Sequence, residues 1–285
     1  MIMDIVISVY NKEKTILNYY NKLIEELKDL KYRIIFVDDN SSDKTLEVLK
    51  SIQKDDEAKV KIISLSKTQG KDTCIYAGLR HVTHPLACII DLDLNANVSY
   101  VTKMYDYITT HDEYDSVCMY SNYEEKSFLK RTKIKLLNKL YDLNINNNKT
   151  YYRIIRKNVI DALHNINKNY PFNNYSFELL GFNTYYMKFD NNNINNDNLN
   201  KYICFTTKPY NLFKSINYAL ILILFVLFVL SLLKVFTIST NILLLIIILF
   251  NIINLSLLDL SIKLLNKEKT YYLIKEKIGF DENVL

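Results

Sequence analysis

Short apolar runs alternate with segments of helical period along the first 110 residues, and this alternation is the strongest constraint on the fold. We predict strands over residues 4–9, 33–37, 60–65 and 87–91, and helices over residues 16–27, 44–53, 71–80 and 97–110. Alternating strands and helices are typical of an α/β domain with a mostly parallel sheet covered on both faces. Polar clusters follow the predicted strands, so they should meet at the carboxyl edge, where open α/β sheets bind ligands.

The fourth predicted strand ends in the sequence Asp-Leu-Asp-Leu-Asn, residues 91–95. Residues two apart on an extended segment point to the same face, so Asp91, Asp93 and Asn95 can present three oxygen ligands together. Mg²⁺ and Mn²⁺ take such ligands and commonly hold a substrate diphosphate as well. The alternative is a solvated acidic turn, because an Asp-x-Asp pair alone is too short to be specific.

Composition narrows the possible function classes. The chain has 285 residues and a formal net charge of +5, which is too modest to predict nucleic-acid binding. Its four cysteines are scattered without metal or redox spacing, so we interpret them as core thiols in a reducing compartment.

Two almost wholly apolar runs, residues 216–236 and 242–262, each approach the ~20 residues that a membrane-spanning helix needs. Together they predict a two-helix transmembrane hairpin over residues 209–263, between a domain over residues 1–208 and a tail over residues 264–285. The alternative is a buried helical pair in a soluble protein.

Lysines flank this predicted hairpin on both sides, whereas only Lys234 lies near its turn. The positive-inside rule therefore predicts a two-span membrane protein whose catalytic domain is cytoplasmic. Asn251 and Asn254 lie within the second run and should face protein, which allows a homo-oligomer. A basic amphipathic helix over residues 126–141 is equally compatible with a solvated face and with a role at a membrane surface.

Several short motifs occur in a familiar order. They are Val9-Tyr-Asn-Lys-Glu13, Val37-Asp-Asp-Asn-Ser-Ser-Asp43, Gly70-Lys71 with Ala77-Gly78, Ile90-Asp-Leu-Asp-Leu-Asn95, and Tyr152-Arg-Ile-Ile-Arg156. In this order the chain resembles the GT-A-fold (Rossmann-like) family 2 inverting glycosyltransferases. With the apolar hairpin it is similar to the polyprenyl-phosphate sugar transferases, such as dolichol-phosphate mannose synthases and bactoprenol glucosyltransferases.

The resemblance implies a role for each matching position. The residues implied to bind a UDP- or GDP-sugar are Ser8, Tyr10, Asn11, Glu13, Asp38, Asp39, Lys71 and Asp91. Asp91, Asp93 and Asn95 are implied to hold Mg²⁺ or Mn²⁺ on the diphosphate.

The acceptor side follows the family less closely. Thr150-Tyr151 stands where members often have an Asp, and residues 191–202 keep little of the usual acceptor segment. Glu178 is the acceptor-site carboxylate that we predict. The guanidinium groups expected to bind an acceptor phosphate belong to Arg131, Arg153 and Arg156, because their geometry matches phosphate.

We therefore predict a metal-dependent, membrane-anchored transferase that moves a sugar from a nucleotide-diphosphate sugar to a polyprenyl phosphate, with Asp91, Glu178 and Arg153 as the catalytic residues. Two alternatives are a processive polysaccharide synthase and a degenerate scaffold of the same fold without turnover. The absence of any Trp disfavours the synthase, since that class resembles this chain early but uses a Gln-x-x-Arg-Trp motif.

Overall fold

The computed structural model describes residues 1–94, 97–121, 128–141, 148–166, 172–189, 208–230, 246–256, 258 and 272–280. The chain divides into two compact units. The first comprises Met1–Lys126, Asn146–Asp197 and Thr270–Leu285, and the second comprises Ser127–Ile145 and Asn198–Lys269.

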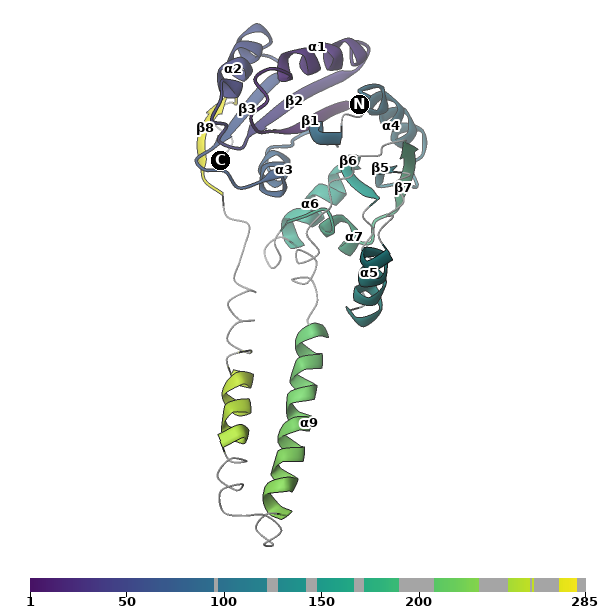
Figure 1. Cartoon of the computed structure of the whole chain (residues 1–285). Helices are drawn as coiled ribbons and strands as arrows, with labels where there is room; N and C mark the ends of the chain where they lie inside the picture. The colour runs from purple at the N-terminus through teal and green to yellow at the C-terminus, as the bar shows by residue number, and fades with distance from the viewer. Residues whose placement is uncertain are drawn as a thin grey trace. The chain divides into compact units, whose positions relative to one another are not determined.

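The first unit is built on one eight-stranded sheet with the strand order β7-β5-β6-β4-β1-β2-β3-β8 (Figure 1). Its parallel centre consists of β1 (Ile2–Val9), β2 (Lys31–Asp38), β3 (Val60–Leu65) and β4 (Leu86–Ile90). These strands are nearly continuous runs of Val, Ile and Leu because both faces of the sheet are covered. The predicted α/β domain is present, and its four central strands match the four that we predicted.

Helices cover the two faces of this sheet (Figure 1). One apolar core lies under α1 (Ile16–Glu26), α2 (Thr45–Asp55) and α4 (Ser99–Thr110). The opposite core lies under α3 (Lys71–Leu79), α6 (Lys157–Ile166) and the short α7 (Ser176–Leu179). Alternate residues of each strand supply the two cores, as the period of two requires.

Helix α3 packs unusually close to the sheet at Gly78. A Cβ atom at this position would lie 2.4 Å from Cγ1 of Val6 and 3.1 Å from Cγ2 of Val37. Glycine is therefore needed here for close contact between the carboxyl end of α3 and the sheet.

The remaining strands make the sheet mixed. Strand β6 (Lys149–Arg156) runs antiparallel to β4 and to β5 (Ser116–Ser121), while β7 (Thr184–Phe189) is parallel to β5. Strand β8 (Ile274–Ile278) lies within the predicted tail and pairs antiparallel with β3. Sequence patterns gave no indication that this distant segment joins the sheet.

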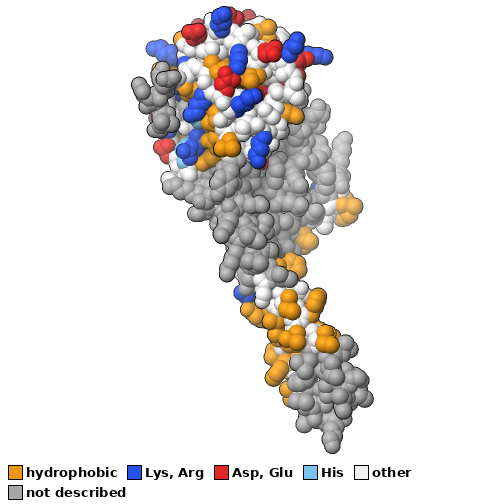
Figure 2. Space-filling view, turned by 90° about the vertical axis from the view of Figure 1, so that its left-hand side faces the viewer, with side chains coloured by type: hydrophobic (Ala, Val, Ile, Leu, Met, Phe, Trp, Pro, Cys, Tyr) orange, Lys and Arg blue, Asp and Glu red, His pale blue; other side chains and the backbone are white. Residues whose placement is uncertain are grey.

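The second unit contains α5 (Phe128–Tyr141) and α9 (Lys208–Leu230), which contact each other. Large apolar side chains are exposed along α9, including Phe213, Leu222 and Phe225 (orange in Figure 2).

The predicted transmembrane hairpin, and the two-span membrane localisation built on it, are wrong by the criterion of helix length and hydropathy. Among the residues with described structure, no helix combines enough length with enough apolar character to cross a bilayer. The apolar runs extend into residues 231–245 and 259–271, which lie outside the described residues.

Candidate functional site

Two carboxylates and two lysines meet where β4 ends. The Lys71 ammonium lies 2.7 Å from Oδ1 of Asp91 and 2.6 Å from Oδ2 of Asp93. The Lys12 ammonium lies 3.2 Å from the other carboxylate oxygen of Asp93. Both predicted acidic residues thus face one cationic position at the carboxyl edge of the sheet.

The local backbone explains this convergence. After β4, the chain tightens into a 3₁₀ turn, η1 (Leu92–Leu94), in which the Asp93 N–H donates to Asp91 Oδ1 at 3.1 Å. Lys71 is the first residue of α3 and follows Gly70, whose φ of 89° only glycine adopts readily. The turn and the start of the helix therefore bring the lysine onto both carboxylates.

Electrostatics keep these groups charged. Burial alone would raise the pKa of Asp93, but hydrogen bonds and charge from Lys71 and Lys12 hold that pKa below its usual value. Burial likewise favours a lower pKa for Lys71, and the two aspartates outweigh it, so the lysine pKa is raised. Both shifts favour the charged forms of Asp93 and Lys71 at neutral pH.

Strand β2, which β1 separates from β4, ends at Asp38, and Asp39 follows it; both aspartates are buried. Asp38 accepts hydrogen bonds from the Ser64 hydroxyl at 3.0 Å and the Ser41 N–H at 3.2 Å. Asp39 accepts the backbone N–H groups of Gln69 and Gly70 at 2.7 and 2.8 Å, which ties β2 to the start of α3.

The loop after β1 holds the other predicted donor-binding residues. Asn11, at φ 50°, accepts the Ser42 N–H at 2.9 Å, and Glu13 accepts the Lys44 N–H at 2.9 Å. Asparagine tolerates this left-handed conformation better than most residues. Ser8 is partly buried in β1, and the Tyr10 ring is 47% exposed. The loops after β1 and β2 therefore form one polar wall beside Asp39, with an aromatic ring facing solvent.

The donor set fits a hard divalent cation. Asp91 and Asp93 already converge on one ammonium, and carboxylate oxygens are the ligands that Mg²⁺ and Mn²⁺ prefer. No three or more His, Cys, Asp or Glu side chains gather into a complete metal cage within the described part of the chain. One or two carboxylates plus substrate phosphates is a common way to bind Mg²⁺. The third predicted ligand, Asn95, lies outside the described residues.

A third charged group contains Glu178, the predicted acceptor-site carboxylate. Its Oε2 accepts a hydrogen bond from Lys149, the first residue of β6, and the Tyr186 hydroxyl lies 3.4 Å from its Oε1. Sequence analysis missed Lys149, because the lysine precedes the recognisable motif by three residues and only the direction of β6 brings it to this edge.

Two of the predicted phosphate-binding arginines do not fit that role. Arg153 is 1% exposed, and its guanidinium donates to the Thr150 carbonyl at 2.7 Å and Asn174 Oδ1 at 2.6 Å while stacking on Phe177. A side chain so buried cannot grip a ligand directly.

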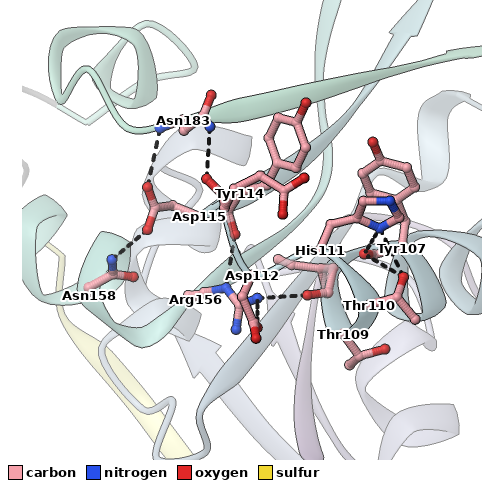
Figure 3. A network of polar contacts seen from close by, with 12 residues as sticks. Tyr107, Thr109, Thr110, His111, Asp112, Tyr114, Asp115, Arg156, Asn158 and Asn183 are labelled. Carbon is pink, nitrogen blue, oxygen red and sulfur yellow. Dashed lines mark hydrogen bonds and ion pairs between the residues drawn. The ribbon is translucent and has the colours of Figure 1, made fainter.

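Arg156 lies at the opposite edge, because antiparallel β6 pairs it with Leu86 at the amino end of β4. It donates to the carbonyls of Tyr114 and Ile108 and pairs with Asp112 at 3.0 Å (Figure 3). The arginine therefore ties the end of α4 to β6. The third arginine, Arg131, is exposed on α5 in the second unit, and its role remains a prediction.

The sheet order and the acidic edge are typical of α/β domains whose ligands bind beyond the carboxyl ends of parallel strands. The chain belongs to glycosyl transferase family 2, whose profile matches residues 4–180. The family resemblance and the predicted enzyme class are confirmed at this level, whereas the polyprenyl-phosphate subgroup stays a prediction.

Two curated relatives illustrate the likeness. The Bacillus subtilis (strain 168) protein named "Putative glycosyltransferase CsbB" is 28% identical over 188 residues, which are 64% of this chain and 56% of that protein. An uncharacterized glycosyltransferase of Synechocystis sp. is 26% identical over 195 residues, 66% of this chain and 60% of that protein. The chain thus matches less than two thirds of the length of either relative.

Solved structures show a weaker likeness. Glucosyl-3-phosphoglycerate synthase from Mycobacterium tuberculosis, in complex with Mn²⁺, UDP and glucosyl-3-phosphoglycerate, has a TM-score of 0.48 and 17% identity, covering 70% of this chain and 74% of that one. A mannosyltransferase from Pyrobaculum calidifontis, in complex with GDP-Man and Mn²⁺, has a TM-score of 0.45 and 14% identity, covering 69% and 58%. These values are too low to transfer a function.

Proposed function

We propose that this protein transfers a sugar from a nucleotide-diphosphate sugar to the phosphate of a polyprenyl phosphate. Family membership supports the reaction class, and one structural observation supports the donor class. The carboxylates of Asp91 and Asp93 converge on a single cationic position, filled by the Lys71 ammonium, beside the polar wall formed by the loops after β1 and β2. A nucleoside diphosphate needs both parts, a polar pocket for the base and a cation for the diphosphate.

Each part of the site has a distinct task in this proposal. Asp39 and the loops that carry Asn11 and Glu13 would bind the base and ribose, and the exposed Tyr10 ring would stack on the base. Asp91 and Asp93 would hold Mg²⁺ or Mn²⁺, which when bound neutralises charge on the departing diphosphate. Before a metal binds, Lys71 pairs with both carboxylates and Lys12 with Asp93.

The reaction exchanges one bond at the anomeric carbon. An oxygen of the acceptor phosphate forms the new bond from one face while the bond to the nucleoside diphosphate breaks on the other, which inverts the configuration. A phosphate is already anionic near neutral pH, so it needs orientation and charge compensation more than a general base. The Tyr151 at the position where an aspartate is usual in the family is compatible with that requirement.

The test is turnover with a panel of UDP- and GDP-sugars, undecaprenyl phosphate in detergent, and Mn²⁺ or Mg²⁺. We expect one donor to give a glycosylated lipid product, and Asp93→Asn to lower turnover at least ~100-fold by removing charge at the diphosphate. The matched control is Asp106→Asn, an exposed change on α4 that should leave turnover unchanged.

Turnover that persists in EDTA and in Asp93→Asn would refute the metal assignment. Full nucleotide binding with neither transfer nor donor hydrolysis would refute the transferase and favour a scaffold without turnover.

A further inference from the structure

The first residue of β6, Lys149, lies at the same edge and on the same face as Asp91. Antiparallel β4 and β6 pair Ile89 with Arg153, so residues before Arg153 extend past the carboxyl end of β4. Side chains at alternate positions share a face, and a strand advances about 3.3 Å per residue. Strand β5 gives the distance across an irregularity in β6: Cys118 pairs with Arg153 and Tyr120 with Lys149, so Lys149 lies on the face of Arg153 and roughly 7 Å further along the sheet.

A direct contact links the two regions. The Tyr151 hydroxyl donates to Asp72 at 2.6 Å, and Asp72 follows Lys71 in the first turn of α3. Lys71 in turn contacts both carboxylates of the acidic edge. The first turn of α3 thus contacts both the acidic edge, through Lys71, and β6, through Asp72.

Lys149 is held in a nearly enclosed but reachable position. It pairs with Glu178, the side chains being 11% and 18% exposed, and its ammonium lies 4.9 Å from the centroid of the Tyr186 ring. Burial favours a lower pKa for Lys149, but Glu178 and Tyr186 outweigh it and raise the pKa. The lysine is therefore charged when a ligand arrives.

Positive charge exceeds negative charge in this cluster. The cluster also contains the buried Arg153. Its guanidinium has two neutral hydrogen-bond partners, the Thr150 carbonyl and the Asn174 amide oxygen, and its Nε has no partner. Asn174 bonds both the guanidinium and the Lys149 carbonyl. Among the described contacts, Glu178 is thus paired with Lys149, and no carboxylate is paired with Arg153, although buried charges are normally compensated.

We propose that Lys149 binds the phosphomonoester of the acceptor, exchanging Glu178 for the phosphate, with Arg153 as a positioning residue that adds a second positive charge from below. The proposal rests on the proposed function and deepens it, because it assigns the acceptor-side cation to a residue outside the three predicted arginines. Glu178 then acts as the counter-ion of the empty site, and its charge opposes acceptor binding.

Binding is tested with geranyl phosphate on the full chain by isothermal titration calorimetry, without donor or metal. Lys149→Met should weaken binding ~10- to 100-fold, because it removes the charge-assisted hydrogen bond from Lys149 to the phosphate. Lys149→Arg should stay within ~3-fold of the unmodified protein because it keeps the charge. Glu178→Gln should tighten binding, since it removes the competing anion.

The matched control is Lys157→Met, which removes a lysine paired with Asp161 at the start of α6, directly after the opposite end of β6. It should leave geranyl phosphate binding unchanged. Unchanged binding in Lys149→Met, or equal weakening in Glu178→Gln and Lys149→Met, would overturn the exchange. The arginine and glutamine variants keep the test decisive if Lys149→Met fails to fold.

Two ligand arms identify the source of the phosphate, and a kinetic arm separates this inference from the proposed function. Geraniol should not bind, and inorganic phosphate should bind at least ~10-fold more weakly than geranyl phosphate; equal binding by inorganic phosphate would overturn the assignment to a lipid phosphate.

With an active donor, Lys149→Met should raise the acceptor KM and leave the donor KM unchanged. If Lys149 is needed for geranyl phosphate binding but no sugar is transferred, only the proposed function is refuted. If sugar is transferred and Lys149→Met leaves the acceptor KM unchanged, only this inference is refuted.

Discussion

Replacing Lys71 by methionine should make the protein bind Mn²⁺ more tightly when no nucleotide is present. In the structure the Lys71 ammonium occupies the position on which Asp91 and Asp93 converge, at 2.7 and 2.6 Å. A divalent cation held by the same two carboxylates must therefore displace the lysine. Methionine keeps most of the side-chain length but cannot compete for the carboxylates.

The size of the effect follows from the two contacts that the lysine must give up. A hydrogen bond to a charged group contributes about 1.5–3 kcal/mol. The contact with the buried Asp91 counts fully, whereas Asp93 is 38% exposed, also pairs with Lys12, and so counts less. A net cost of about 2 kcal/mol corresponds to a Mn²⁺ affinity ~30-fold higher in Lys71→Met.

Electron paramagnetic resonance of free Mn²⁺ during a titration of the full chain measures this affinity without any need for turnover. The control is Lys50→Met, which removes another paired lysine, 2.7 Å from Glu276 of β8. That variant should bind Mn²⁺ as the unmodified protein does. Equal or weaker Mn²⁺ binding in a folded Lys71→Met protein would refute the idea that lysine and metal share one position.

Three further predictions concern the scaffold and the donor pocket. Asp4→Asn should lower the free energy of unfolding by about 3–5 kcal/mol at pH 7 in urea titrations, because Asp4 is fully buried and accepts Arg33 at 2.7 and 2.9 Å. Burial alone would raise the pKa of Asp4, but hydrogen bonds from Arg33 and His84 outweigh burial and hold that pKa below its usual value. The stabilisation by Asp4 is therefore complete above the unfolded pKa of about 3.9 and is lost as pH falls through the folded pKa. The variant and the unmodified protein should thus have the same free energy of unfolding in acid. Gly78→Ala should cost about 1–3 kcal/mol of thermal stability, since its Cβ would lie 2.4 Å from a side-chain atom of β1, and an unchanged melting temperature would contradict the close packing. Asp39→Ala should raise the donor KM more than it lowers kcat, because a base contact is equal in ground and transition states, and a normal KM with a collapsed kcat would argue against a base pocket.

The first half of the fold could be predicted from sequence because its signals are local. Short continuous apolar runs and helices of period 3.6 indicate β1 to β4 and the helices between them, and polar residues directly after each strand mark the binding edge. Asp91 and Asp93 do converge, but the extended geometry that we predicted for them is wrong, because a 3₁₀ turn over Leu92–Leu94 brings them together. The order of short motifs was sufficient to indicate the family.

Only the tertiary structure decided where the later residues lie, because strand direction and partner depend on contacts distant in sequence. Lys149 and Arg156 are the two ends of β6, yet its antiparallel pairing with β4 brings the lysine to the binding edge and carries the arginine to the opposite one. Burial of Arg153 depends on α7 and Asn174, which no local pattern joins to β6. Strand β8 joins the sheet from the far end of the chain by pairing with β3. Hydropathy along the sequence records how apolar a segment is, but what that segment packs against is fixed only when the whole chain has folded.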